Sequence, residues 1–125
     1  MVTVRIARLD HLIFTVRDIG EICTFYERVL GMEIKRFAGE RMALHFGDQK
    51  INLHKAGAEF EPKAARPTPG SADLCLVLDG SFVQAVATLQ SEKIELIEGP
   101  VERIGAVGSM QSIYFRHPDG NLIGV

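Results

Sequence analysis

The sequence has few cysteines, no long apolar run and no excess of either charge, and each absence excludes a class of protein. Only two of the 125 residues are cysteine. Cys23 and Cys75 both lie in periodic apolar segments, so we expect small buried residues of a reducing compartment, not a disulfide. No apolar stretch approaches the about 20 residues that a membrane span needs. The 14 basic and 16 acidic residues give a net charge of -2, which provides no reason to expect nucleic acid or a membrane as a partner.

The N-terminal residues do not contain the apolar core of a secretory signal. Because Met1 to Arg5 show no such core, we expect a cytoplasmic protein. A chain of 125 residues corresponds to a single domain, residues 1–125, and is long enough to bury a substantial core.

Apolar spacing in the first half predicts a βαβββ unit over residues 8–54. Residues 9–16 and 50–54 alternate as strands do, and two more strands are predicted over 32–37 and 41–46. The pattern also predicts a helix from Asp18 to about Leu30. This helix has a capping pair at its start, a glycine at its end, and one apolar stripe formed by Ile22, Phe25, Tyr26 and Val29.

The same order of elements is predicted again over residues 72–125. The pattern indicates strands over 72–78, 94–97, 110–115 and 121–125, a helix over 82–89, a break at Gly99-Pro100, and a tight turn that exposes His117. The proline-rich stretch 55–71 joins the two modules and is long for a loop, which favours a lid or a crossover. We therefore predict an α+β fold of two tandem βαβββ modules, whose eight strands form a half-open cup.

Two histidines lie on the strand faces that point away from the predicted core. His11 alternates with Leu12, and His54 alternates with Leu53. Neutral imidazole is the commonest metal ligand, although a single strand histidine is just as consistent with an ordinary half-buried residue. Overlaying the modules puts His11 on Asp73 and His54 on Gly124.

Three stretches carry a family resemblance. These are Leu9-Asp10-His11-Leu12, Phe25-Tyr26 followed by Leu30-Gly31-Met32, and residues 117–123 (HPDGNLI). With them the chain resembles the vicinal oxygen chelate superfamily of glyoxalase I, bleomycin-resistance proteins, fosfomycin-resistance enzymes and extradiol dioxygenases. Residues 47–54, 59–64 and 69–71 look most similar to the short group called glyoxalase domain-containing protein 5.

The resemblance implies one divalent metal ion in the cup, Mn, Zn, Ni or Fe. By match to the family, His11, His54 and Asp73 would bind the metal. The family's ligating Glu also serves as the base in proton transfer, and its nearest replacements in this chain are Asp73, the candidate catalytic residue, and a metal-bound water. Gly124 departs from the pattern, because the family normally has a ligating Glu there. The resemblance also implies a homodimer and a small-molecule substrate.

Weaker candidates for substrate binding are His45, Tyr114 and Arg116. Alternation along their strands puts these side chains on the face that points into the cup, although each is also consistent with an ordinary surface residue.

The sequence and the resemblance leave two function classes open. One is a metal-dependent enzyme acting on a small oxygenated or electrophilic metabolite, as a lyase, an epoxide-directed transferase or a dioxygenase. The other is a metal-free protein that sequesters a ligand. Fold alone does not choose between them.

Overall fold

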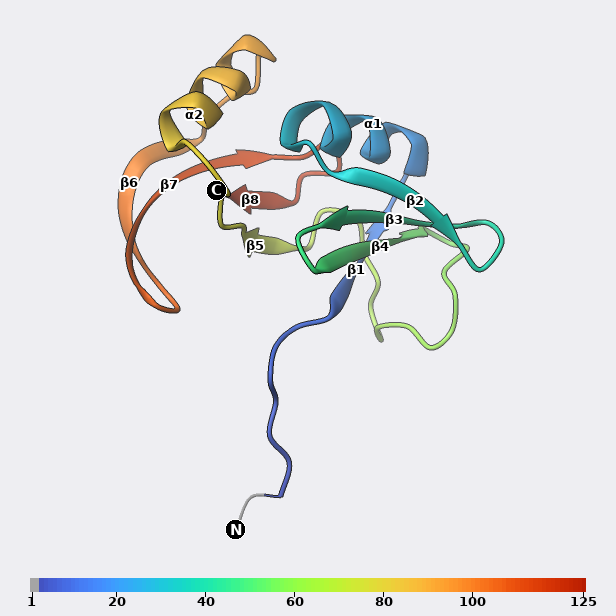
Figure 1. Ribbon diagram of the computed structural model, residues 1–125. Helices are drawn as coiled ribbons and strands as arrows, with labels where there is room; N and C mark the ends of the chain where they lie inside the picture. Colours follow the sequence, from blue (N-terminus) through green and yellow to red (C-terminus); the bar gives the residue numbers. More distant parts are fainter. Residues whose placement is uncertain (1–2) are drawn as a thin grey trace.

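The structure, a computed structural model, describes residues 3–125 and consists of two βαβββ modules joined by the segment 56–72 (Figure 1). The first module comprises β1 (His11–Val16), α1 (Ile19–Leu30), β2 (Glu33–Phe37), β3 (Arg41–Phe46) and β4 (Gln49–Lys55). The second comprises β5 (Asp73–Cys75), α2 (Phe82–Ser91), β6 (Glu98–Gly105), β7 (Gly108–Arg116) and β8 (Leu122–Gly124). This confirms the predicted duplication of the βαβββ unit.

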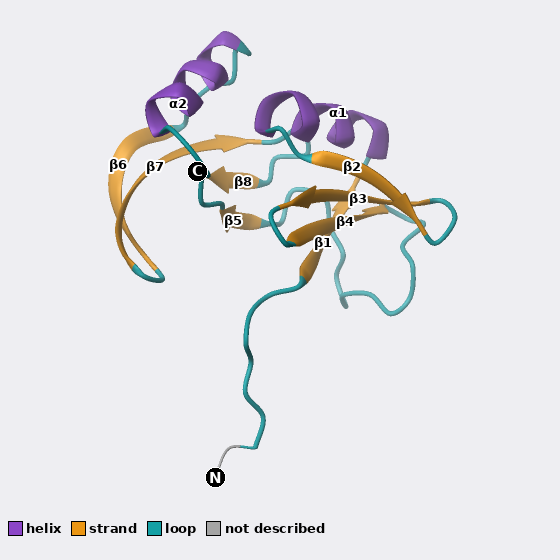
Figure 2. Ribbon diagram, in the orientation of Figure 1, coloured by secondary structure: helices purple, strands orange, loops and turns teal. Residues whose placement is uncertain are grey.

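Each module forms its own four-stranded mixed sheet, and the two sheets have equivalent topology. The strand orders are β1-β4-β3-β2 and β5-β8-β7-β6. In both sheets the first and last strands of the module pair in parallel, whereas the other pairs are antiparallel. Both helices lie on the same side of the strands (Figure 2). The connecting loop lies against strands of the first sheet, where Phe60 contacts His54 and Arg41.

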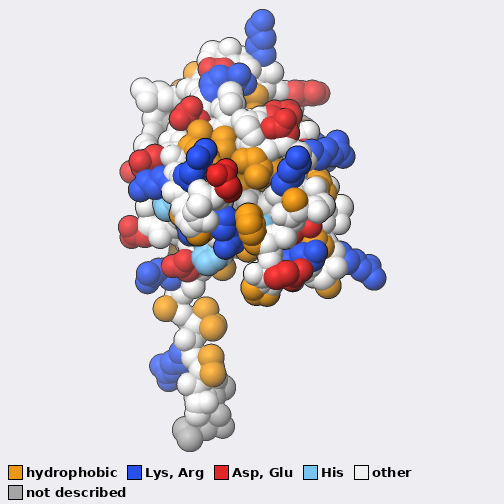
Figure 3. Space-filling model, turned by 90° about the vertical axis from the view of Figure 1, so that its right-hand side faces the viewer, with side chains coloured by type: hydrophobic (Ala, Val, Ile, Leu, Met, Phe, Trp, Pro, Cys, Tyr) orange, Lys and Arg blue, Asp and Glu red, His pale blue; other side chains and the backbone are white. Residues whose placement is uncertain are grey.

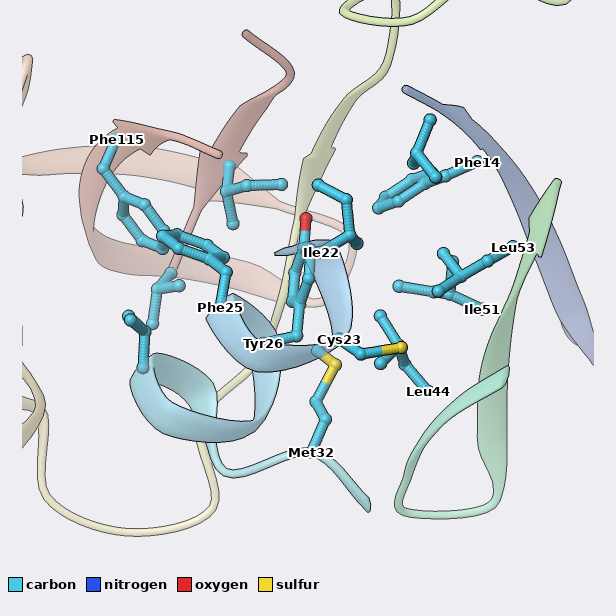
Figure 4. Packing of buried hydrophobic residues seen from close by; sticks show 14 of the residues in the cluster. Phe14, Ile22, Cys23, Phe25, Tyr26, Met32, Leu44, Ile51, Leu53 and Phe115 are labelled. Atoms are coloured by element: carbon cyan, nitrogen blue, oxygen red, sulfur yellow. The ribbon is translucent and has the colours of Figure 1, made fainter. Parts of the chain in front are cut away.

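Helix α1 forms where the sequence provides a cap at each end. The Asp18 Oδ1 accepts a hydrogen bond from the Glu21 N–H at 3.0 Å, and Gly31 ends the helix in the left-handed region with φ 66. The predicted apolar stripe is buried and packs against both sheets at once (Figure 4). Among the cluster members are Phe14 and Leu53 of the first sheet and Phe115 of the second. The two modules therefore share one core.

The third strand of the second module differs from the prediction. Residues 94–97 are a connection instead of a strand, and β6 begins at Glu98 and includes the Gly99-Pro100 pair. The break expected at this pair is an irregularity inside the strand, because the pairing with β7 shifts register between Glu98 and Val101. Proline is tolerated there because β6 is an edge strand, where one side of the backbone needs no hydrogen-bonding partner. Ile94 and Leu96 are apolar because they pack against the core.

Two further expectations are corrected by the burial pattern. Cys23 is buried as predicted, but Cys75 is exposed, and neither forms a disulfide. His117 is 2% exposed instead of lying on the surface. Its ring stacks on Phe14 at 5.7 Å between centroids, and Tyr26 lies against it at the same distance. In the part of the chain that the structure describes, no helix has the length and apolar character to span a membrane.

Candidate functional site

The face of the first sheet that points away from α1 carries the histidines singled out by the sequence. In the parallel ladder between β1 and β4, His11 lies opposite Lys50, Ile13 opposite Asn52, and Thr15 opposite His54. Successive residues of a strand point to opposite faces, so these side chains share one face, as the alternation predicts. His45 of β3 lies on the same face, because it is paired with Lys50 in the antiparallel ladder between β3 and β4.

The register separates His11 from His54. They are four ladder positions apart, which corresponds to about 13 Å along the strands at about 3.3 Å per residue. The His11 side chain is 40% exposed, and its Nδ1 lies 2.7 Å from the carboxylate of Asp10. This hydrogen bond lowers the pKa of Asp10 below its ordinary value.

His54 lies in a different environment, because it is 2% exposed. Its Nε2 is buried and has no hydrogen-bond partner in residues 3–125. The His54 ring meets the Phe60 ring of the connecting loop edge-on, with 5.5 Å between centroids. The Arg41 guanidinium lies over the same Phe60 ring, 4.5 Å from its centroid. Burial, aided by the positive charge of Arg41, lowers the pKa of His54. The imidazole is therefore held neutral, with an unpartnered nitrogen.

A pocket of about 310 Å³ opens beside His54, between β1 and the connecting loop. Ile13, Thr15 and His54 line its sheet side. The loop closes it with two cations, Lys63 and Arg66, and two hydroxyl-bearing residues, Thr68 and Ser71. Ala72 and Asn121, which directly precede β5 and β8, complete the wall. The volume is at the lower end of the range for small-molecule sites.

The loop side of this pocket was not predicted from the sequence. Residues 55–71 have no periodicity from which the direction of a side chain can be inferred, so Phe60, Lys63 and Arg66 were not candidates. The segment gave two signals. Its length indicated a lid or a crossover between modules, and residues 59–64 resembled a family group, but neither signal assigned a role to a side chain.

The register also corrects the overlay of the two modules. β1 begins at His11 and β5 begins at Asp73, so the first strands match as expected. In the ladders, however, Asn52 lies opposite Ile13, and Gly124 lies opposite Cys75, the residue equivalent to Ile13. The counterpart of Gly124 is therefore Asn52, not His54. The Oδ1 of Asn52 is buried and, like the Nε2 of His54, lacks a partner within residues 3–125.

The candidate residues of the second sheet lie away from the pocket beside His54. Gly124 lies opposite both Tyr114 and Cys75, and an added Cβ at this glycine would lie 2.9 Å from the Tyr114 Cε1. Tyr114 also stacks under the Arg103 guanidinium at 5.6 Å, and Arg116 donates to the Gly120 carbonyl at 3.0 Å. None of the candidates from the second sheet lines the pocket beside His54.

A divalent ion, which the family resemblance implies, needs several donors close together. Among residues 3–125, no three or more His, Cys, Asp or Glu side chains gather closely enough to hold an ion. In particular, His11, His54 and Asp73 do not form one cluster within a single chain. The donor set of one chain therefore does not fit a resident metal ion.

The sequence profile described as the Glyoxalase/Bleomycin resistance protein/Dioxygenase superfamily matches residues 8–125. The chain belongs to this superfamily. This confirms the resemblance carried by the first strand, the helix end and the HPDGNLI turn, and it confirms the fold. The superfamily covers both function classes considered above.

Two curated proteins are similar to the chain over most of its length. "Virulence protein STM3117" of Salmonella typhimurium is 53% identical over 96% of this chain and 83% of its own length. Its crystal structure superimposes with a TM-score of 0.95, covering 97% of this chain and 96% of that one. "Glyoxalase domain-containing protein RDO1" of Mycosarcoma maydis is 54% identical over 92% of this chain, which spans only 65% of that protein's length.

More distant structures share the fold alone, and they include both an enzyme and a binding protein. A lactoylglutathione lyase from Agrobacterium tumefaciens is 19% identical, with a TM-score of 0.72 over 97% of this chain and 93% of its own. TnmS3, an antibiotic binding protein from Streptomyces sp. CB03234, is 21% identical, with a TM-score of 0.71 over 97% and 95%. The fold is therefore compatible with either class, and the residues of the site must decide.

Proposed function

We propose that the chain binds a small oxygenated metabolite with a negative charge in the pocket between β1, β4 and the connecting loop. The observation that carries the proposal is His54, which lines the pocket and whose buried Nε2 has no partner within residues 3–125. Leaving a buried polar atom unsatisfied costs about 1–3 kcal/mol. A ligand oxygen or hydroxyl that reaches this nitrogen would remove that cost.

The charge of the loop supports an anionic ligand. Arg66 lines the pocket and forms no ion pair with any residue from 3 to 125. Lys63 lies beside it, although its charge is shared with Glu59 at 3.7 Å and Glu61 at 3.5 Å. A guanidinium pairs with a carboxylate or phosphate in a bidentate manner, which makes Arg66 the first candidate for the charged end of the ligand.

Binding without a metal is the function that the geometry of one chain supports best, because one chain does not supply a metal-binding cluster. A metal-dependent enzyme is the second candidate, and the Asp10–His11 pair favours it. A metal-binding histidine commonly uses one ring nitrogen for a carboxylate and the other for the ion. The metal set of His11, His54 and Asp73 stays a prediction, and it would need donors from two copies of the chain.

The catalytic role predicted for Asp73 stays with this second candidate, as do the lyase, transferase and dioxygenase reactions. Substrate contacts by His45, Tyr114 and Arg116 also stay predictions. His45 lies on the first sheet, whereas Tyr114 and Arg116 lie on β7 of the second sheet. A substrate that touches all three would therefore have to span both modules.

The test is a titration of the chelator-treated, full-length protein, followed by NMR of the histidine ring nitrogens. The probes are pyruvate, lactate and inorganic phosphate, with methyl pyruvate as the uncharged counterpart of pyruvate. We expect the His54 ring signals to shift saturably with at least one anion and to change little with the ester. Arg66→Gln should weaken the binding about tenfold, which corresponds to about 1.4 kcal/mol.

Arg36→Gln is the matched control, because Arg36 is an exposed arginine on β2 that does not line the pocket. Binding that appears only after Mn, Zn, Ni or Fe is added would favour the metal-dependent enzyme. If none of the three anions perturbs His54, with or without metal, the assignment of the pocket as an anion site is wrong.

A further inference from the structure

The N-terminal arm, residues 3–10, runs away from the body of the molecule instead of packing on it (Figure 1). Its apolar side chains are exposed: Val4 is 70% exposed, Ile6 85% and Leu9 64%. Hydrophobic and basic side chains of the arm stand clear of the domain (Figure 3). A cluster of large aliphatic residues exposed in this way is typical of a segment that is buried against a partner.

The sequence of the arm keeps it extended. Residues 3–9 (TVRIARL) contain no glycine, proline or asparagine, so nothing favours a turn, and the β-branched Thr3, Val4 and Ile6 favour extended backbone. The arm also carries two cations, Arg5 and Arg8. Neither forms an ion pair within the described chain. Its partner surface should therefore be apolar and carry negative charge.

Such a surface lies on the same molecule, in a groove of about 680 Å³ at the β3–β4 turn and the segment after β5. Its apolar lining includes Leu30, Met32, Phe46, Leu76 and Leu78. Two carboxylates, Asp48 and Asp79, also line it, and neither takes part in an ion pair among residues 3–125. The groove and the arm are complementary in both hydrophobicity and charge.

The start of the arm is fixed beside this groove. The Gln49 side-chain Nε2 donates to the Leu9 carbonyl at 3.3 Å, and Gln49 is itself a lining residue. From there the extended arm leads outward, and at about 3.3 Å per residue its eight residues span about 26 Å. The arm runs away from the body, and no residue from 3 to 9 lines this groove on its own chain (Figure 1).

We propose that residues 3–9 of one copy occupy this groove on a second copy, and that the exchange is reciprocal. In such an isologous dimer Val4 and Ile6 bury their side chains among the apolar lining, and Arg5 and Arg8 approach Asp79 and Asp48. The arm would also lie beside β5, an edge strand of the second sheet whose outer backbone groups have no strand neighbour in the described chain.

A native cysteine makes this arrangement directly testable. Cys75 is exposed and lines the groove, whereas Cys23 is buried. In the full-length Ile6→Cys variant under oxidised glutathione, we expect a disulfide between position 6 of one copy and Cys75 of the other. It should appear as a dimer band on a non-reducing gel, with the linkage confirmed by peptide mass spectrometry. Cys75→Ser in the same background should abolish the band.

Val107→Cys is the matched control, because Val107 is a fully exposed residue in the β6–β7 turn, away from the groove. It should give at most a tenth of the cross-linked dimer. In light scattering, the unmodified protein should have a dimer mass at micromolar concentration. The double change Arg5→Glu and Arg8→Glu should weaken the dimer at least tenfold, and Asp48→Arg with Asp79→Arg in that background should restore it.

Three outcomes would overturn the proposal. A disulfide within one chain would mean that the arm folds onto its own groove. Equal cross-linking by Val107→Cys would mean that collisions, not docking, bring the thiols together. A monomer mass across the micromolar range would mean that no second copy binds the arm.

Discussion

Protonation of the buried His117 should make the stability of the fold depend on pH in a range set by this one ring. Its Nδ1 accepts a hydrogen bond from the Asp119 N–H at 3.2 Å, and its Nε2 contacts the side-chain amide of Asn121. Burial lowers the pKa of His117 to about 4, although the Asp119 carboxylate opposes this shift. Protonation would also turn Nδ1 from an acceptor into a donor, so two donors, Nδ1–H and the Asp119 N–H, would face each other.

The sign and size follow from linkage. Because the unfolded chain has the ordinary histidine pKa of about 6.5, it binds a proton between pH 6.5 and 4, where the folded ring stays neutral. The stabilising effect is therefore fully present above pH 6.5 and is lost progressively as the pH falls from 6.5 to about 4. Between pH 7.5 and 4, this group alone should lower the free energy of unfolding by about 3 kcal/mol.

Urea denaturation followed by circular dichroism, in steps from pH 7.5 to pH 4, measures this loss. In His117→Phe the ring stack on Phe14 can persist but nothing titrates at position 117, so its loss over the same range should be smaller by about 3 kcal/mol. The matched control is His45→Phe on the first sheet, which should keep the parent's pH dependence. If His117→Phe and the parent lose stability in parallel, a neutral buried His117 is not the cause.

Three other changes test single features of the fold, each by chemical denaturation. Tyr26→Phe should leave stability unchanged or raise it by up to about 1 kcal/mol, because the buried hydroxyl has no partner within residues 3–125; a loss above 2 kcal/mol would reveal one. Gly124→Ala should cost about 1–3 kcal/mol, since its Cβ would lie 2.9 Å from the Tyr114 ring, and the cost should shrink in a Tyr114→Ala background. Asp18→Ala should cost about 1 kcal/mol through loss of the helix cap, whereas Asp18→Asn should cost less; equal losses would mean that the cap hydrogen bond contributes little.

The elements that the sequence predicts well are those whose local signals agree with their packing. In α1 the cap at Asp18, the apolar stripe and Gly31 all indicate the same helix, and the structure has it over Ile19–Leu30. The prediction failed at residues 94–97, where partly buried apolar residues imitate a strand. The break predicted at Gly99-Pro100 is a shift in the pairing register and not the end of a strand, because β6 is an edge strand, which tolerates proline.

The candidate site was predictable in one respect and not in another. Alternation correctly placed His11, His45 and His54 on one face of the first sheet. Alternation has a period of two, however, and gives neither the register between strands nor the distance between residues on the same face. His117 was misplaced for a related reason: its turn is covered by Tyr26 of α1, a tertiary contact that no local signal reports.

The strand β4 presents two buried polar side chains in succession on the face away from the core, Asn52 and then His54. Both are at most 5% exposed, and the Oδ1 of the first and the Nε2 of the second lack partners within residues 3–125. Each unpaired atom costs about 1–3 kcal/mol, a large part of the 5–15 kcal/mol that stabilises a typical domain. An apolar residue at either position would avoid this cost, as Leu53 does on the opposite face. Buried polar atoms without partners are expected where a protein binds a ligand, so the face of β4 that carries Asn52 and His54 should border the binding site.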